Sequence, residues 1–279
     1  MKKISRRSFL AAAGLSVAAL ALTACGGSSS SVASSVASSA ASSEAASTSA
    51  AAGELTTVEA GKLTMATNAT FPPYEMTTDA GDIEGIDVET AQAIADKLGL
   101  ELQIDDMDFD AALLSVQQGK ADIVMAGVTV TDERKAVMDF SDSYATGIQS
   151  IIVPEGSDIA SPDDLAGKKI GTQRGTTGYI YCSDDFGDEN VVAYDDGLTA
   201  VQALNNGQVD AVVIDNAPAQ EFVAANPGLK VLDTSYAEED YAIGMAKGSA
   251  LEDAVNKALE ELKADGTLQA IVDKYINAN

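Results

Sequence analysis

The sequence contains no histidine, only two cysteines and few basic residues. Without histidine, the chain can form no Ser-His-Asp or Cys-His catalytic site and no histidine metal site. We therefore expect neither a metal ion nor a cofactor. The cysteines are Cys25 and Cys182, and no disulfide framework is possible if Cys25 carries lipid. Cys182 lies in a predicted helix, where we interpret it as a small core residue.

Acidic residues dominate the charge of the chain. There are 43 acidic and 17 basic residues, which gives a net charge of −26. A surface of this sign argues against nucleic acid as a partner, because nucleic acid needs a basic face. It also disfavours contact with anionic lipid. We interpret the excess charge as a contribution to solubility.

Residues 1–24 are typical of an export signal, with a basic start and an apolar segment at 9–22. The apolar segment is shorter than a typical membrane span, and a retained anchor helix is the alternative. Leu22-Thr23-Ala24-Cys25 resembles the lipobox of bacterial lipoproteins, in which the cysteine is lipidated, and residues 5–10 resemble a twin-arginine signal. Cleavage would remove four basic residues and change the net charge from −26 to −30.

Residues 25–54 consist almost entirely of serine and alanine after Cys25 and two glycines. Such a segment cannot bury a core, so we predict a flexible tether with a mean reach of about 30 Å. The folded part then spans residues 55–279.

Strand and helix patterns alternate through the folded part. Gly99 suits a helix C-cap, and the prolines of Phe71-Pro72-Pro73-Tyr74 cannot continue a central strand. The alternation predicts an α/β fold with parallel or mixed sheets. The predicted elements include strands at 62–67, 100–104, 123–125 and 241–245 and helices at 88–98, 109–116, 251–262 and 268–275.

Two segments repeat a pattern. Gly119-Lys120-Ala121-Asp122 and Gly207-Gln208-Val209-Asp210 each follow a predicted helix and lead into an apolar strand, and residues 61–67 resemble residues 167–172. The repeat predicts two lobes of similar build. We assign 55–146 and 241–279 to lobe 1 and 147–240 to lobe 2, with hinge segments near 144–148 and 239–243.

A strand-to-helix turn in lobe 1 offers an anion site. Thr131 is a predicted helix N-cap, and Arg134 lies in the first turn, so N–H groups, hydroxyls and a guanidinium face one small volume. An exposed arginine on a solvated helix is the alternative.

The predicted second lobe adds two features at the carboxyl ends of strands, where ligands of open α/β sheets bind. The glycine-containing turn at 173–178 opens a helix, and Asp215 follows a strand at 211–214. Arg134 and Asp215 together would hold the carboxylate and the ammonium of an α-amino acid. Two unrelated surface charges are the alternative.

These segments carry a family resemblance. Over residues 55–279 the chain resembles the family 3 extracellular solute-binding proteins, which are the amino-acid receptors of ABC importers. Thr90 departs from the family pattern, which usually has an aliphatic residue there. The resemblance lies in the motifs at 85–89, 119–122, 127–134, 139–141, 173–177, 210–215 and 263–267.

The resemblance implies a type II periplasmic-binding-protein-like fold and a set of ligand-binding residues. The Gly127 backbone, Thr129 and Arg134 would hold the ligand carboxylate, and Thr176 and Thr177 would add donors from lobe 2. The full set is Asn68, Phe71, Phe109, Gly127, Thr129, Arg134, Gln173, Thr176, Thr177 and Asp215.

Other residues of the set would contact the ammonium group and the side chain of the ligand. Asp215 would bind the α-ammonium, and Phe71 and Phe109 would cover the side chain, with core packing as the alternative for Phe109. Relatives that take basic amino acids often carry Asp at the Asn68 position, so the amide favours a polar, uncharged ligand. Arg174 leaves an acidic ligand open.

The resemblance further implies a monomeric, non-enzymatic receptor that closes on its ligand and delivers it to an ABC permease. We expect it at the outer face of the cytoplasmic membrane, anchored through Cys25, or in the periplasm of a cell with an outer membrane. Two alternatives are a cyclohexadienyl dehydratase-like enzyme, with Glu75 or Asp215 as general acid, and a sensor or adhesion lipoprotein.

Overall fold

The computed structural model describes residues 55–276. The predicted export signal, the tether and the lipidation site at Cys25 lie outside the described residues. No helix in the described part is long and apolar enough to cross a membrane.

The first sheet combines residues from both ends of the described chain. Strand β1 pairs in parallel with β5 and β6, whereas β14 pairs antiparallel with β6 and β7. In spatial order the strands are β5 (Glu101–Asp106), β1 (Lys62–Thr67), β6 (Ile123–Val124), β14 (Gly244–Ala246) and β7 (Met138–Phe140). The helices between them are α1 (Ile86–Leu98), α2 (Phe109–Gln117) and α3 (Asp132–Val137).

The second sheet is formed by the middle of the chain. Strand β9 lies parallel to β10 and β11, and β8 runs antiparallel to β11, β12 and β13. The strands are β8 (Ala145–Pro154), β9 (Ile170–Gln173), β10 (Val191–Tyr194), β11 (Ala211–Asp215), β12 (Leu229–Val231) and β13 (Ala237–Tyr241). The helices are α4 (Thr177–Phe186), α5 (Gly197–Asn205), α6 (Asn216–Ala225) and the 3₁₀ helices η1 (Pro162–Leu165) and η2 (Asp188–Asn190).

A small antiparallel sheet follows β1. Its strands are β2 (Thr70–Phe71), β3 (Glu75–Thr77) and β4 (Ile83–Glu84). The two prolines lie between β2 and β3, so the predicted break after β1 is confirmed. The predicted C-cap is confirmed as well, because Gly99 ends α1 in the left-handed conformation with a φ of 70°.

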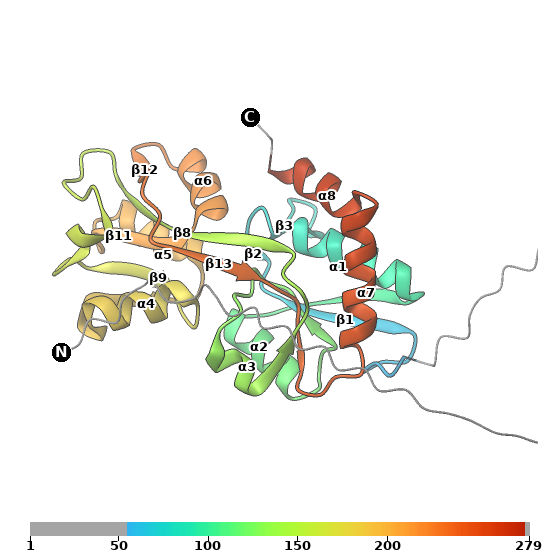
Figure 1. Ribbon diagram of the computed structural model, residues 1–279. Coiled ribbons are helices and arrows are strands. Elements are labelled where there is room, and N and C mark those ends of the chain that lie inside the picture. Colours follow the sequence, from blue (N-terminus) through green and yellow to red (C-terminus); the bar gives the residue numbers. More distant parts are fainter. Residues whose placement is uncertain (1–54, 277–279) are drawn as a thin grey trace, which may run out of the picture. The chain divides into compact units, whose positions relative to one another are not determined.

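Two strands connect the first sheet with the second. Strands β8 and β13 pair antiparallel from Ala145 and Tyr241 to Gln149 and Ala237, and Figure 1 shows them side by side. The predicted strand at 241–245 was wrong as one element: β13 ends at Tyr241 and β14 begins at Gly244. The residues between them leave the ladder because the Ala242 N–H donates to the Val128 carbonyl and the Ile243 N–H to Ser141 Oγ.

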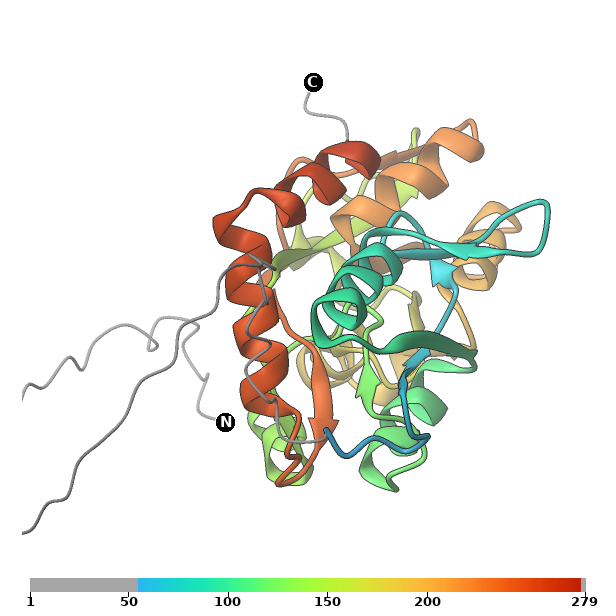
Figure 2. The same ribbon diagram turned by 90° about the vertical axis from the view of Figure 1, so that its right-hand side faces the viewer.

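The C-terminal helices return to α1. Helices α7 (Glu252–Ala264) and α8 (Thr267–Tyr275) both contact α1, and Figure 2 shows them in red beside it. The buried side chains of Val255, Leu259 and Leu262 on α7 join the core that covers the first sheet. Gly266, with a φ of 81°, makes the turn between the helices, as the predicted break at 265–266 requires.

An aspartate brace explains the predicted repeat. Asp122 exchanges two hydrogen bonds with Thr64, its N–H donating to the Thr64 carbonyl and its Oδ2 accepting from the Thr64 N–H at 2.8 Å. Asp210 makes the same pair of bonds with Lys169, the second again at 2.8 Å. Asp122 also accepts from the Val58 N–H at 2.8 Å. Each brace fixes the start of one sheet strand against the next.

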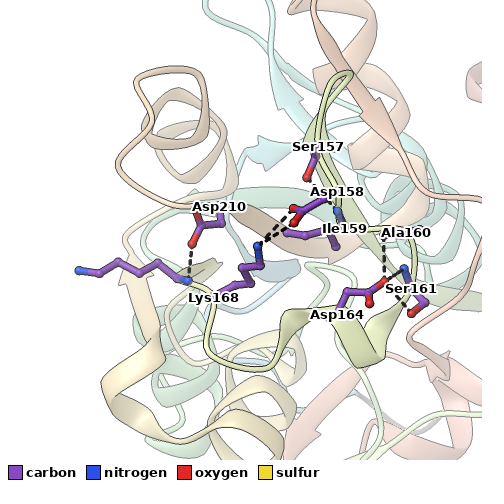
Figure 3. Close-up of polar contacts among 9 residues, drawn as sticks. Ser157, Asp158, Ile159, Ala160, Ser161, Asp164, Lys168 and Asp210 are labelled. Atoms are coloured by element: carbon purple, nitrogen blue, oxygen red, sulfur yellow. Dashed lines mark hydrogen bonds and ion pairs between the residues drawn. The ribbon is translucent and has the colours of Figure 1, made fainter.

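The surroundings of the second brace are shown in Figure 3. Lys168 pairs with Asp158 at 3.2 Å. Nearby, Asp164 Oδ2 accepts from the Ser161 N–H at 2.9 Å and closes a capping box at the start of η1. The helix start predicted at Ser161-Pro162 is therefore present, as a short 3₁₀ turn.

We expect Asp122→Asn to lower the free energy of unfolding by about 1–3 kcal/mol, because the substitution removes a charged acceptor from two backbone N–H groups. Asp210→Asn is the matched control and should cost less, since Asp210 is exposed and water can replace its bonds. Urea unfolding of both variants measures the difference. An equal decrease in the free energy of unfolding for the two variants would contradict the assigned role of the buried Asp122 brace.

Candidate ligand-binding site

One pocket brings together all ten residues that the sequence predicts as ligand-binding. It lies at the carboxyl ends of β1, β6, β9 and β11 and is closed on one side by the end of β13. Six further residues line it: Glu75, Ala126, Gln149, Val213, Ile214 and Tyr241. The ten residues therefore lie together at the strand ends, as expected from the rule that ligands of open α/β sheets bind there.

Arg134 is buried in this pocket, with 9% of its surface exposed. Thr131 Oγ1 accepts from the Arg134 N–H at 3.2 Å, which confirms Thr131 as the N-cap of α3. The guanidinium donates to the Thr129 carbonyl at 2.8 Å and to the Gly175 carbonyl at 3.2 Å, and it lies 5.4 Å from the centre of the Phe109 ring. Arg134 therefore contacts both the first-sheet and the second-sheet sides of the pocket.

Burial lowers the pKa of Arg134, and the charge of Glu239 acts in the opposite direction. An arginine stays cationic under such a shift. Both of the guanidinium hydrogen bonds named above go to neutral carbonyl oxygens. The positive charge is consequently directed at the pocket, where an anionic group would be attracted.

Thr129 joins three parts of the chain. Its hydroxyl lies 3.3 Å from the Thr177 hydroxyl of α4 and donates to Glu239 Oε2 on β13 at 3.1 Å. Glu239 also accepts from Gln149 Nε2 on β8 at 2.9 Å. The sequence analysis missed this buried carboxylate, because a glutamate in Glu238-Glu239-Asp240 looks like a solvated charge.

Gly127 lines the pocket with a backbone that only glycine suits. Its φ is +53°, and a Cβ there would lie 2.8 Å from the Phe71 ring. The expectation that its backbone holds a ligand carboxylate is not met by the N–H, because that group donates to Asp87 Oδ2 at 2.9 Å. Asp87 thus fixes the loop before Thr129.

The Asn68 amide is already occupied. It donates to the Met107 carbonyl at 3.0 Å and accepts from the Thr70 hydroxyl at 3.0 Å and from Gln173 Nε2 at 2.9 Å. The Asn68–Gln173 bond joins the loop after β1 to the end of β9. Both residues therefore close the pocket, and the amide of Asn68 gives little information about the ligand side chain.

The start of α4 faces the pocket through Thr176 and Thr177. The Thr176 hydroxyl donates to the Gln173 carbonyl at 2.8 Å and accepts from the Tyr179 N–H at 3.3 Å as the helix cap. Its hydroxyl is thus used internally, contrary to its expected role as a ligand donor. The helix start still presents its first N–H groups and the Thr177 hydroxyl.

Asp215 lines the same pocket from the second sheet, at the end of β11 and the N-cap of α6. Its carboxylate accepts from the Ile148 N–H at 2.7 Å and the Ala217 N–H at 3.0 Å. Burial raises its pKa to about 6, although these N–H groups and the Tyr241 hydroxyl lower it. At neutral pH the group is mainly an anion, which a ligand ammonium would stabilise.

Aromatic rings form the apolar part of the site. The Phe71 and Tyr74 ring centres are 5.7 Å apart, and Tyr74 meets Tyr241 edge to face at 5.5 Å. Phe109 both lines the pocket and packs in the core beside α2, so its two predicted roles are compatible. Tyr241 was missed because its position depends on where β13 ends.

Glu75 is the most informative residue that the prediction of the site left out. It is fully buried, and neither side-chain oxygen has a hydrogen-bond partner of ordinary geometry. Burial, followed by the charge of Asp87, raises the pKa of Glu75 well above its usual range. Within residues 55–276 no cluster of histidine, cysteine and carboxylate side chains could hold a metal ion.

Comparison with known proteins agrees with the fold described above. The family model for bacterial extracellular solute-binding proteins, family 3, matches residues 63–278. The L-cystine-binding protein TcyJ of Escherichia coli (strain K12) is 35% identical over 226 residues, which cover 79% of this chain and 85% of that protein.

Two solved structures share the fold. The arginine-, lysine-, histidine-binding protein ArtJ from Geobacillus stearothermophilus has a TM-score of 0.75 and 34% identity, covering 78% of this chain and 96% of its own. An ancestral arginine-binding protein bound to glutamine has a TM-score of 0.74 and 43% identity, covering 77% and 98%. These neighbours are type II periplasmic binding proteins, which confirms the predicted fold class. The chain belongs to family 3 of the bacterial extracellular solute-binding proteins.

Proposed function

We propose that this protein is the extracytoplasmic receptor of an amino-acid ABC importer, which binds a free L-α-amino acid in the pocket and delivers it to the membrane permease. The observation that carries the proposal is that Arg134 and Asp215 line the same buried pocket. The relatives support it, because they are named as binding proteins for cystine and for arginine, lysine and histidine.

The chemistry of the pocket suits a zwitterion. The ligand carboxylate would accept from the Arg134 guanidinium and from N–H groups at the start of α4, and the ammonium would donate to Asp215. The Thr177 hydroxyl, which lies beside that of Thr129, is a further donor to the carboxylate, whereas the Thr129 hydroxyl already donates to Glu239. The aromatic wall of Phe71 and Tyr241 would cover the ligand.

For the ligand side chain, the buried charges favour a cation over the polar, uncharged group expected from Asn68. Glu75 lines the pocket with no hydrogen-bond partner among the described residues apart from Asp87, whereas the Asn68 amide makes three hydrogen bonds to the protein. We therefore place arginine first. Glutamine is the uncharged competitor, since the ancestral arginine-binding protein was solved with glutamine bound.

The motion proposed is closure of two lobes, 55–146 with 241–279 and 147–240, about the hinge segments near 144–148 and 239–243. The bonds from Arg134 to Gly175 and from Gln173 to Asn68 are contacts that opening would break. A ligand held from both sides favours the closed form, which the permease would recognise. We propose a monomer, because the pocket needs no residue from a second chain.

The proposed location follows from the N-terminal sequence. An export signal at 1–24 and a lipid on Cys25 would place the receptor at the outer face of the cytoplasmic membrane, or in the periplasm if the cell has an outer membrane. The Ser/Ala-rich segment at 25–54 would tether it near the permease and raise its effective concentration there.

The dehydratase alternative has no support from the relatives, which are named as binding proteins. The sensor or adhesion alternative makes a different prediction in solution. If no free amino acid raised the melting temperature, that alternative would gain and the receptor proposal would fail.

The role of Arg134 is tested by Arg134→Ala, which should weaken amino-acid binding at least about 100-fold, because a buried partner of the ligand carboxylate is lost. Arg174→Ala is the matched control: Arg174 is exposed, so the same loss of charge should change the affinity little for a cationic or neutral ligand. Isothermal titration calorimetry measures both. Unchanged binding by the Arg134 variant would refute the carboxylate assignment.

The role of Asp215 is tested by pH. Because its pKa is about 6 before binding, protonation below that value removes the partner of the α-ammonium, and the affinity should fall about tenfold per pH unit at lower pH. Above about pH 7 this effect should be absent. Asp215→Asn should remove the dependence for a ligand with a neutral side chain, such as glutamine, and weaken α-amino acids far more than analogues without the amine. Equal losses for both ligand types would exclude the assignment.

A further inference from the structure

Three buried side chains beside the pocket play no part in the proposed binding of the ligand's α-carboxylate and α-ammonium. Glu75 and Asp87 are both 0% exposed, and Tyr144 is buried beside them. Four of their oxygens have no hydrogen-bond partner outside these three residues in the described part of the chain: both of Glu75, Asp87 Oδ1 and the Tyr144 hydroxyl. Glu75 lines the ligand pocket, so this cluster is in direct reach of a ligand side chain.

The charges that surround the cluster are nearly all of one sign. Asp106, at the end of β5, acts on Glu75, and Asp215, at the end of β11, acts on the neighbouring side chains of Tyr74 and Tyr241. Among the residues described, the lining of the pocket has one positive side chain, Arg134. Two adjacent carboxylates in such surroundings cannot both be ionised at low cost.

The environment decides which carboxyl group holds the proton. Asp87 accepts the Gly127 N–H at 2.9 Å, which favours its charged form. Burial raises the pKa of Asp87 to about 6, and the Gly127 N–H, Tyr144 and Glu75 act against that rise. Burial and the Asp87 charge raise the pKa of Glu75 much further. The proton therefore belongs to Glu75, and Asp87 is the anion beside it.

We propose that Glu75 and Asp87 form a proton-exchange subsite for the cationic end of the ligand. The inference rests on the proposed function. Before binding, Glu75 is a neutral carboxylic acid. When a guanidinium or ammonium group enters, Glu75 releases its proton to solvent and pairs with the ligand as a carboxylate, and no covalent bond to the ligand forms or breaks. The net charge of this subsite is thus −1 in both states, so binding adds no buried charge.

This exchange makes the preference for cations depend on pH. Release of one proton means that the affinity for a cationic ligand rises by about tenfold per pH unit over the range in which Glu75 is protonated. A neutral ligand of the same shape gains nothing from Glu75. Titration of Asp215 affects both ligands equally, because both carry the α-ammonium, so the ratio of the two affinities isolates the subsite.

The experiment compares L-arginine with L-citrulline, in which a neutral urea group replaces the guanidinium. Calorimetric titrations of the full chain between pH 5.5 and 8.5, in buffers of different ionisation enthalpy, count the protons released. The expected result is up to one more proton released with arginine than with citrulline, and an affinity ratio that rises with pH. A ratio that does not change with pH would overturn the subsite and leave the receptor function standing.

Glu75→Gln prevents ionisation at this position while the fold is kept, because the amide has the shape of the protonated acid. The variant should lower the ratio of arginine affinity to citrulline affinity at least tenfold and lose the extra proton. Glu84→Gln, an exposed position on β4, is the matched control and should change nothing. Retention of the extra proton by the Glu75 variant would overturn the proposal. If neither amino acid binds the wild type, the ligand class proposed above fails, and this inference fails with it.

Discussion

A buried guanidinium is the constraint on which the pocket depends. Arg134 is buried, its guanidinium donates to the Thr129 and Gly175 carbonyls, and no carboxylate of residues 55–276 forms an ion pair with it. Such a charge is costly unless an anion shares the site. Because one carbonyl belongs to the loop after β6 and the other to the turn before α4, satisfying Arg134 also brings the two sides of the pocket together.

The same local interaction positions the polar groups of the pocket in both sheets. In each, an aspartate at the start of a strand braces the neighbouring strand, through Asp122 in the first sheet and Asp210 in the second. The strands that are held in this way end at the pocket. A repeated local device therefore positions a cation from one sheet and an anion, Asp215, from the other, which matches the two charges of an amino acid.

The fold class could be predicted from the sequence, and so could the ten residues that line one pocket, because strand ends, helix caps and a specific family motif are local patterns. It did not reveal that the Gly127 N–H is held by Asp87, or that Glu75 and Glu239 are buried in or beside the site. Burial of a carboxylate is set by distant segments that pack over it. The end of β13 at Tyr241 was missed for the same reason, because the next two residues, Ala242 and Ile243, donate hydrogen bonds to Val128 and Ser141.

In the proposed complex, Arg134 and Asp215 hold opposite ends of the same amino acid. A crystal structure of the protein with L-arginine would show this arrangement. We expect the α-carboxylate within hydrogen-bond distance of the Arg134 guanidinium and the α-ammonium in contact with Asp215. A ligand bound in the reverse orientation, or one that touches only one of these two residues, would contradict the proposed arrangement.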